Sequence, residues 1–95
     1  MVQLRYEWNE AKRAENLEKH GIDFMAVHAF DWTNAAVFQD RRRRYGERRF
    51  YAYGHVAGRL HVVVFTDRAD VRRVISFRKA NPREQAAYAT GAPGN

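Results

Sequence analysis

The chain has 95 residues, of which 45% are hydrophobic, so it is long enough for one compact domain with one core. It contains no cysteine, which excludes disulfides, thiolate catalysis and cysteine-ligated zinc, and no apolar run suggests a membrane span or a signal peptide, so we expect a cytoplasmic protein. The 17 basic residues, nearly all arginine, outnumber 11 acidic ones for a net charge of +6, which favours a nucleic-acid partner over the alternative of an arginine-rich genome.

The first third of the chain predicts one strand and two helices. Residues 2–8 alternate apolar and polar side chains, which indicates a strand with one buried face. Asn9 is a typical N-cap, and Gly21 is a typical end for the helix in which apolar residues recur at helical spacing (Ala11, Ala14, Leu17). Asp23 is placed to cap a second, short helix that we expect to end near residues 32–34.

The middle of the chain predicts a meander of three strands. Residues 35–40 are either a short strand or an extended link, and the run Arg41-Arg42-Arg43-Arg44 is expected to form an exposed loop. Strand-like runs follow over residues 48–56, 59–66 and 71–79, with a turn at residues 67–70. Because the links between the runs are short, the three strands should pair antiparallel.

The end of the chain predicts a last helix and completes the fold class. Asn81 is an N-cap, Pro82 suits the first helical position and Glu84 completes a capping-box-like pair, so a helix should run to about Thr90. The order β-α-α-β-β-β-α predicts an α+β fold with helices on one face of an antiparallel sheet. We expect a single domain over residues 1–90 and a flexible tail over residues 91–95.

Two motifs resemble the BrnT family of type II toxins. KHGI-x-F occupies residues 19–24, and R-x-I-S-x-R-K-A occupies residues 73–80, with Glu84 and Tyr88 after it. The similarity covers residues 4–88 in the family's order and spacing. It implies a RelE-like fold, ribonuclease activity that inhibits translation and growth, and neutralisation by BrnA, a DNA-binding ribbon-helix-helix antitoxin. One departure is the run of four arginines, where the family has a mixed polar loop; it points to stronger, less selective RNA binding here.

The resemblance points to a small catalytic set. RNA cleavage without a metal needs a base for the 2′-OH, an acid for the 5′-oxygen and fixed positive charge for the phosphorane, and RelE-like enzymes supply these with Arg, Lys, Tyr and Glu. The catalytic candidates are therefore Arg78, Lys79, Glu84, Tyr88 and His20. No cofactor or metal is expected.

Each of these candidates also has a structural alternative. Arg78 is expected to clamp phosphate, or else to be an arginine at the sheet edge paired with Glu84. Strand alternation puts Arg78 on one face with Ser76, and Lys79 on the other face with Arg73, Ile75 and Phe77. Tyr88 shares a helix face with Glu84 and either contacts RNA or anchors the helix. His20 is either an acid or base, or a helix cap whose charged form the helix dipole favours.

Further arginines are candidates for RNA binding. They are Arg48, Arg49, Arg59 and Arg73, together with Arg41, Arg42, Arg43 and Arg44. Tyr51, Tyr53 and His55 share a strand face with Arg49, which is typical of a base-stacking platform and equally of a face packed under helices. His55 and His61 flank a turn and are candidate cross-strand partners, although the lack of nearby carboxylates argues against a metal site.

The sequence thus predicts a metal-independent endoribonuclease toxin whose partners are RNA and an antitoxin bound in a hetero-oligomer. Two other classes remain open at this point. One is a basic nucleic-acid-binding module without catalysis, and the other is a protein whose arginines contact an acidic partner. Composition does not separate the three; the R-x-I-S-x-R-K-A motif followed by Glu84 and Tyr88 favours the enzyme.

Overall fold

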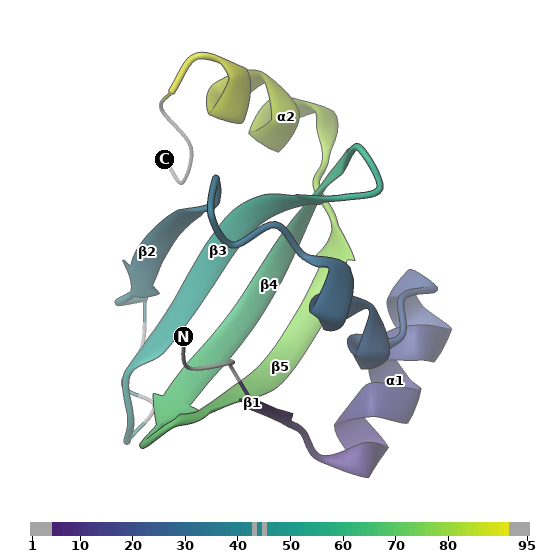
Figure 1. Ribbon diagram of the computed structural model, residues 1–95, viewed down its shortest axis with the longest axis vertical. Helices are drawn as coiled ribbons and strands as arrows, with labels where there is room; N and C mark the ends of the chain where they lie inside the picture. The colour runs from purple at the N-terminus through teal and green to yellow at the C-terminus, as the bar shows by residue number, and fades with distance from the viewer. Residues whose placement is uncertain (1–4, 43, 45, 92–95) are drawn as a thin grey trace.

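The computed structural model describes residues 5–42, 44 and 46–91, and a five-stranded sheet forms its centre (Figure 1). The strand order is β1-β5-β4-β3-β2. The strands are β1 (Arg5–Glu7), β2 (Ala36–Asp40), β3 (Arg49–Val56), β4 (Arg59–Arg68) and β5 (Val71–Lys79). The helices are α1 (Glu10–His20), the 3₁₀ helix η1 (Phe24–Ala29) and α2 (Pro82–Ala89). The α+β class is confirmed, and no described helix is long and apolar enough to cross a membrane.

The sheet is mixed and not antiparallel throughout. The strands from β2 to β5 form an antiparallel meander, in agreement with the short links between them. The strand β1, whose expected start at residues 2–4 lies outside the described residues, pairs parallel with β5. No short turn joins β1 to β5, so nothing in the local sequence fixes their relative direction. Residues 36–40, for which a strand and a link were both open, form the edge strand β2.

The helix α1 begins and ends where its caps predict, but its buried side is different. The side chain of Asn9 accepts from the backbone N of Lys12, and Gly21 ends the helix at φ 72°. The apolar positions Ala11, Ala14 and Leu17 are exposed, whereas Asn16 is 6% exposed. The amide of Asn16 donates to the carbonyl of Phe77 and accepts from its N–H, so it acts as a strand partner for β5.

The segment after α1 supplies one side of the main core. Asp23 caps η1 by accepting from the N of Met25, as predicted. The helix is 3₁₀ and ends at Ala29, earlier than expected, because Phe30 is already extended at ψ 131°. Its apolar residues pack on one sheet face with Ala52, Val63, Phe65, Val74 and Phe77. Phe30 lies so close to Gly54 that a Cβ at this position would be 2.4 Å from the ring. The position therefore requires a residue without a side chain.

The expectation that all helices lie on one face is wrong. Along β4, Val63 and Phe65 face η1, whereas Leu60 and Val62 belong to a second cluster on the opposite face. That second cluster packs against Tyr88 of α2. Only two residues separate β5 from α2, so the helix starts where the strand ends and folds back over the free face.

Two local features of the meander were also not predicted correctly. The strand β4 continues to Arg68, so the turn is shorter than residues 67–70 and includes Ala69 at φ 55°. In β5 the pairing passes from Val64–Ser76 to Phe65–Val74, which leaves Ile75 as an extra residue. This bulge changes which side chains of β5 share a face.

Candidate active site

A groove lies between α2 and the free face of the sheet, and we call it the α2 groove. Its volume is about 540 Å³. Its sheet side is lined by Tyr51, Tyr53, Val62, Val64 and Arg78, its helix side by Asn81, Arg83, Glu84 and Ala87, and its mouth by residues 39–42. Charged and aromatic side chains thus meet in one concave site.

The floor of the groove is a row of side chains across three strands. Tyr53 of β3 pairs with Val62 of β4, which pairs with Arg78 of β5, so the three residues lie side by side on one face. Glu84 reaches down from the first turn of α2. Arg78 holds it with two hydrogen bonds, at 2.7 Å from Nη1 to Oε1 and 2.8 Å from Nη2 to Oε2. The hydroxyl of Tyr53 donates to Glu84 at 3.4 Å.

These contacts fix the charge state of the three groups. Hydrogen bonds from Arg78 hold the pKa of Glu84 below its ordinary value, with help from the backbone N–H of Asn81. Glu84 in turn raises the pKa of Arg78. Burial, followed by the charge of Glu84, raises the pKa of Tyr53. At neutral pH the site therefore contains a carboxylate, a guanidinium and a protonated phenol.

An aromatic cluster adjoins this floor. The rings of Phe38 and Tyr51 are stacked at 5.6 Å, and Tyr53 meets Tyr51 edge-on at 5.8 Å. Tyr53 is 6% exposed, whereas Tyr51 is half-buried and lines the groove. Of the two alternatives for this strand face, the stacking one fits Tyr51, and the packed one fits the ring of Tyr53, whose hydroxyl still meets Glu84 in the groove.

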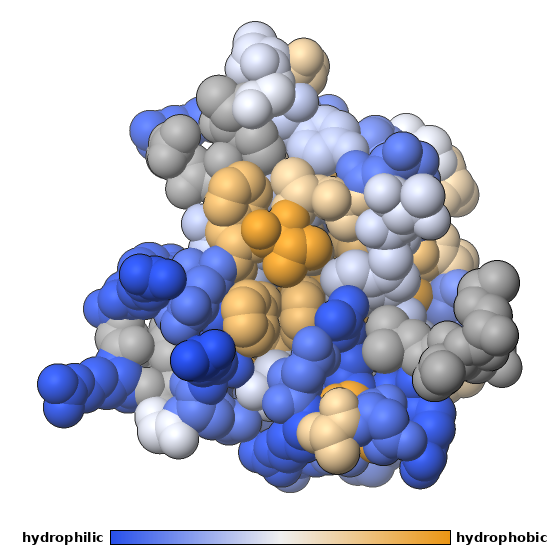
Figure 2. All heavy atoms as spheres, turned by 60° about the vertical axis from the view of Figure 1, so that its left-hand side comes forward, coloured by the Kyte–Doolittle hydropathy of each residue, from blue (hydrophilic) through white to orange (hydrophobic). Residues whose placement is uncertain are grey.

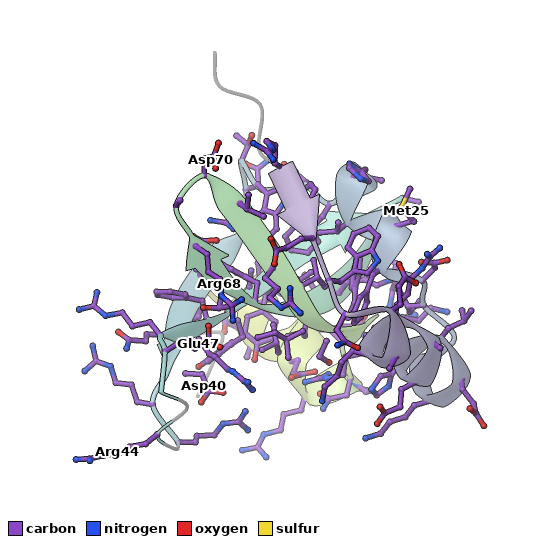
Figure 3. All side chains as sticks on the ribbon, turned by 90° about the horizontal axis from the view of Figure 1, so that it is seen from below. Met25, Asp40, Arg44, Glu47, Arg68 and Asp70 are labelled. Carbon is purple, nitrogen blue, oxygen red and sulfur yellow. The ribbon has the colours of Figure 1, made fainter. Side chains whose placement is uncertain are left out.

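Arginines of the predicted loop stand at the mouth of the groove. Arg42 forms hydrogen bonds of 3.0 and 2.9 Å with Asp40, whose side chain is buried while that of Arg42 is 80% exposed. Arg41 and Arg44 are exposed as predicted, and Figure 3 shows Arg44 pointing away from the sheet. Arg43 lies outside the described residues.

The predicted catalytic set is only partly brought together. Arg78 and Glu84 meet, whereas Lys79 alternates to the other sheet face opposite His61. Tyr88 lies outside the groove, donates to the carbonyl of Asn34 at 2.7 Å and contacts the ring of His55 at 5.5 Å. These contacts favour the anchoring alternative for Tyr88.

His20 lies outside the α2 groove. It borders a shallow hollow between α1 and β5, together with Asn16 and Ser76. Burial lowers its pKa, and the charges of Lys19 and Arg78 lower it further. The direction of this shift is opposite to the one expected from the helix dipole.

The other predicted RNA-binding arginines are spread over the molecule. Arg48 is exposed, and Arg59 donates to the carbonyl of Ala80 at 3.1 Å. Arg49 is half-buried and lies opposite Asp40 in the sheet. Arg73 forms an ion pair with Glu7. The prediction that Arg73 shares a face with Lys79 is wrong, because the bulge at residue 75 moves Arg73 to the face of Ser76 and Arg78.

His55 and His61 are not cross-strand partners. His61 pairs with Gly54 and packs against Phe77 on the core face, whereas His55 pairs with Leu60 and faces α2. The two imidazoles therefore lie on opposite sides of the sheet. Within the part of the chain that the structure describes, no group of three or more His, Asp or Glu side chains is placed to hold a metal ion.

Sequence reasoning did not single out Tyr53 or Arg83 as catalytic or RNA-binding residues. Tyr53 was assigned only to a possible stacking face, although the meander places it two strands from Arg78 at the same level. To predict that Tyr53 lies level with Arg78, the register of both strand pairs must be known. The alternation of hydrophobic residues does not give this register. Arg83 lines the groove because α2 folds over the sheet face opposite to the one expected.

Comparisons with known proteins give the identity of the fold and the family. Residues 8–84 match the family described as the ribonuclease toxin BrnT of type II toxin-antitoxin systems. The chain belongs to this family. The crystal structure of the Brucella abortus ribonuclease toxin BrnT is 30% identical, with a TM-score of 0.66 over 83% of this chain and 99% of that one. No curated protein matches the sequence. The chain is thus an RNA-cleaving toxin with a RelE-like α+β fold.

Proposed function

We propose that this BrnT family member is an endoribonuclease that cuts RNA in the α2 groove without a metal ion. The observation that carries the proposal is the pair of Arg78 and Glu84 on the floor of a groove that also holds Tyr51, Tyr53 and exposed arginines. A fixed guanidinium, an ionised carboxylate and a protonated phenol are the groups that attack by a 2′-oxygen requires.

The proposed reaction assigns one task to each group. The carboxylate of Glu84 takes the proton of the 2′-OH as the 2′-oxygen bonds to phosphorus. Arg78 stabilises the added negative charge on the phosphorane oxygens. The bond to the 5′-oxygen then breaks, and Tyr53, which its raised pKa keeps protonated, gives that oxygen a proton. The products are a 2′,3′-cyclic phosphate and a 5′-hydroxyl, and the proton that Glu84 took returns through water to the phenolate of Tyr53, which restores both groups.

The remaining candidates act around this centre. Tyr88 holds α2 against the sheet, and His20 lies beside β5, the strand that carries Arg78. The loop of residues 41–44, which we call the arginine loop, contributes with Arg48, Arg49 and Arg59 a positive potential along which the RNA backbone binds, whereas Glu7 neutralises Arg73. Lys79 faces away from the groove and contributes only to this potential.

A toxin of a type II system has a cognate antitoxin. We propose that this antitoxin is a DNA-binding ribbon-helix-helix protein, that the pair forms a hetero-oligomer in the cytoplasm, and that an acidic antitoxin segment covers the α2 groove. A chain of net charge +6 would otherwise bind RNA indiscriminately. Full RNA cleavage by the saturated complex would contradict the covering.

The mechanism is tested by incubating purified protein with a 5′-labelled RNA in excess EDTA and analysing the product ends. The proposal predicts undiminished cleavage and a 2′,3′-cyclic phosphate on the 5′ fragment. A requirement for a divalent ion, or fragments that end in a 3′-hydroxyl, would overturn it. A matched RNA with a 2′-deoxy sugar at the cleavage site should remain intact, since it lacks the nucleophile.

A further inference from the structure

One edge of the sheet is covered by other parts of the chain, and the other edge is not paired with any described segment. At one edge, β1 covers the beginning of β5, and the amide of Asn16 pairs with both backbone groups of Phe77 further along. At the other edge, no described segment pairs with the outer side of β2. Proteins usually protect such an edge with proline, lysine or a bulge, and β2 has none of these within Ala36–Asp40.

The outward backbone groups of β2 follow from the pairing of its neighbour. The hairpin between β3 and β4 turns through Ala57 and Gly58, so the pair Val56–Arg59 closes it with hydrogen bonds. Alternate residues of β3 therefore bond to β4, and the others bond in the opposite direction. In agreement, the carbonyl of His55 accepts from the N–H of Asp31, on the side away from β4.

The same alternation extends to β2. Tyr51 and Tyr53 have the parity of His55, so they bond to their partners Phe38 and Ala36 in β2. Val37 and Gln39 then direct their N–H and C=O groups away from the sheet. The edge offers donors and acceptors at these two residues, spaced as a further strand would use them.

Side chains next to this edge define what kind of strand fits. Val37 is 48% exposed, and Figure 2 shows apolar side chains gathered on the β2 side of the molecule within a hydrophilic rim. Just beyond the end of β2, Arg41 and Arg44 are exposed and form no ion pair with the described residues. The edge thus exposes an apolar side chain at Val37 and is strongly positive just beyond its Asp40 end.

We propose that an extended, acidic segment of the antitoxin adds to β2 as a sixth strand. Its main chain bonds to Val37 and Gln39, an apolar side chain covers Val37, and carboxylates at one end meet Arg41 and Arg44. The inference rests on the proposed function only in taking the antitoxin as the partner. RNA would satisfy the arginines but not Val37, and a second copy would bring another net charge of +6 to the same surface.

The test uses the cognate antitoxin and the substitution Val37→Pro. Proline removes the outward N–H without removing a bond to β3, and edge strands tolerate it in that orientation. Val37→Thr is the matched control, because it keeps the N–H and the branched shape. We expect Val37→Pro to weaken antitoxin binding by about tenfold or more, and Val37→Thr to change it by less than about threefold. Equal binding by both variants would overturn the proposal.

Amide hydrogen exchange gives a second readout that does not depend on a variant. In the complex, exchange at Val37 and Gln39 should slow by at least about tenfold relative to the free protein. Unchanged exchange there would overturn the proposal, and so would slow exchange in the free protein that depends on its own concentration, because a second copy would then occupy the edge. RNA cleavage by the same variants in EDTA tests the α2 groove separately, since Val37 lies outside it.

Discussion

At the scale of single residues, Arg78 is placed to bind both Glu84 and a substrate phosphate. In the free protein it holds Glu84 with two hydrogen bonds and so fastens α2, which has no buried residue, to the sheet. Its side chain remains 35% exposed towards solvent and lines the groove. A substrate phosphate can therefore reach the guanidinium without unfolding α2, so the same residue can hold the fold together and take part in the chemistry that we propose.

The first prediction concerns Arg78→Ala. Loss of the charge that stabilises the phosphorane should slow RNA cleavage by about a hundredfold or more, measured as a single-turnover rate at saturating protein. Arg68→Ala is the control, because Arg68 pairs with Glu47 outside the groove and its loss removes the same charge. A folded Arg78→Ala protein that cuts at the rate of Arg68→Ala would exclude Arg78 from the site.

The second prediction follows from the lowered pKa of Glu84, whose ordinary value is 4.5. A carboxyl with a lower pKa in the folded state stabilises the fold fully above its unfolded pKa, and this contribution declines as the pH falls towards the folded pKa. The free energy of unfolding of the wild type should therefore exceed that of Glu84→Gln at pH 7, and the difference should shrink below about pH 4.5. Urea titrations at several pH values measure it, and a constant difference would contradict the pairing.

At the scale of elements, the sequence predicted the helix caps correctly. Asn9, Asp23 and Asn81 begin their helices as predicted, because capping uses a local side chain and a local N–H. The face of α1 that is buried could not be predicted from the sequence. Its buried face is set by Asn16, whose partner Phe77 lies 61 residues away, so no helical periodicity in residues 10–20 indicates it.

The third prediction tests this contact. Asn16→Ala would leave the buried N–H and C=O of Phe77 unpaired, and the free energy of unfolding should fall by about 2–3 kcal/mol. Leu17→Ala is the control on the same turn, and it should change the stability by less than about 0.5 kcal/mol, because Leu17 is 47% exposed. Chemical denaturation of both variants measures the difference, and equal stabilities would show that the amide does not hold α1 to β5.

The candidate site could be predicted from the sequence only for residues that lie close together along the chain. Arg78 and Glu84 are six positions apart across a strand end and a helix start, so local reasoning placed them together. Tyr53 and the loop arginines reach the groove through strand pairing, and the face of Arg73 depends on the bulge at residue 75. Register and bulges result from packing across the whole sheet, which the pattern of a single strand does not encode.

At the scale of the whole molecule, the positive charge is concentrated on one part of the surface. Many arginines are neutralised within the fold by carboxylates, among them Arg13, Arg72 and Arg73. Five arginines make no ion pair with any described residue: Arg41, Arg44, Arg48, Arg59 and Arg83. Three of them belong to the loop between β2 and β3, so the excess charge is greatest beside the mouth of the α2 groove.

The fourth prediction concerns residues 41–44. Replacing all four arginines by serine should weaken RNA binding and reduce its salt dependence, by about 0.7 in the slope of log K against log salt for each phosphate that the protein no longer neutralises. The rate of cleavage of bound RNA should be unchanged, because we expect the loop to bind phosphates without taking part in the chemistry. Binding titrations over a range of salt concentrations measure the first effect, and normal binding with failed cleavage would show that the loop takes part in chemistry.

The location of the active site is tested most directly by a crystal structure with an uncleavable RNA that carries 2′-O-methyl groups. We expect a backbone phosphate within hydrogen-bond distance of the guanidinium of Arg78, the blocked 2′-oxygen facing Glu84 and a base against Tyr51. RNA bound only to the arginine loop, or on the sheet face covered by η1, would contradict the assignment of the α2 groove as the place where this toxin cuts RNA.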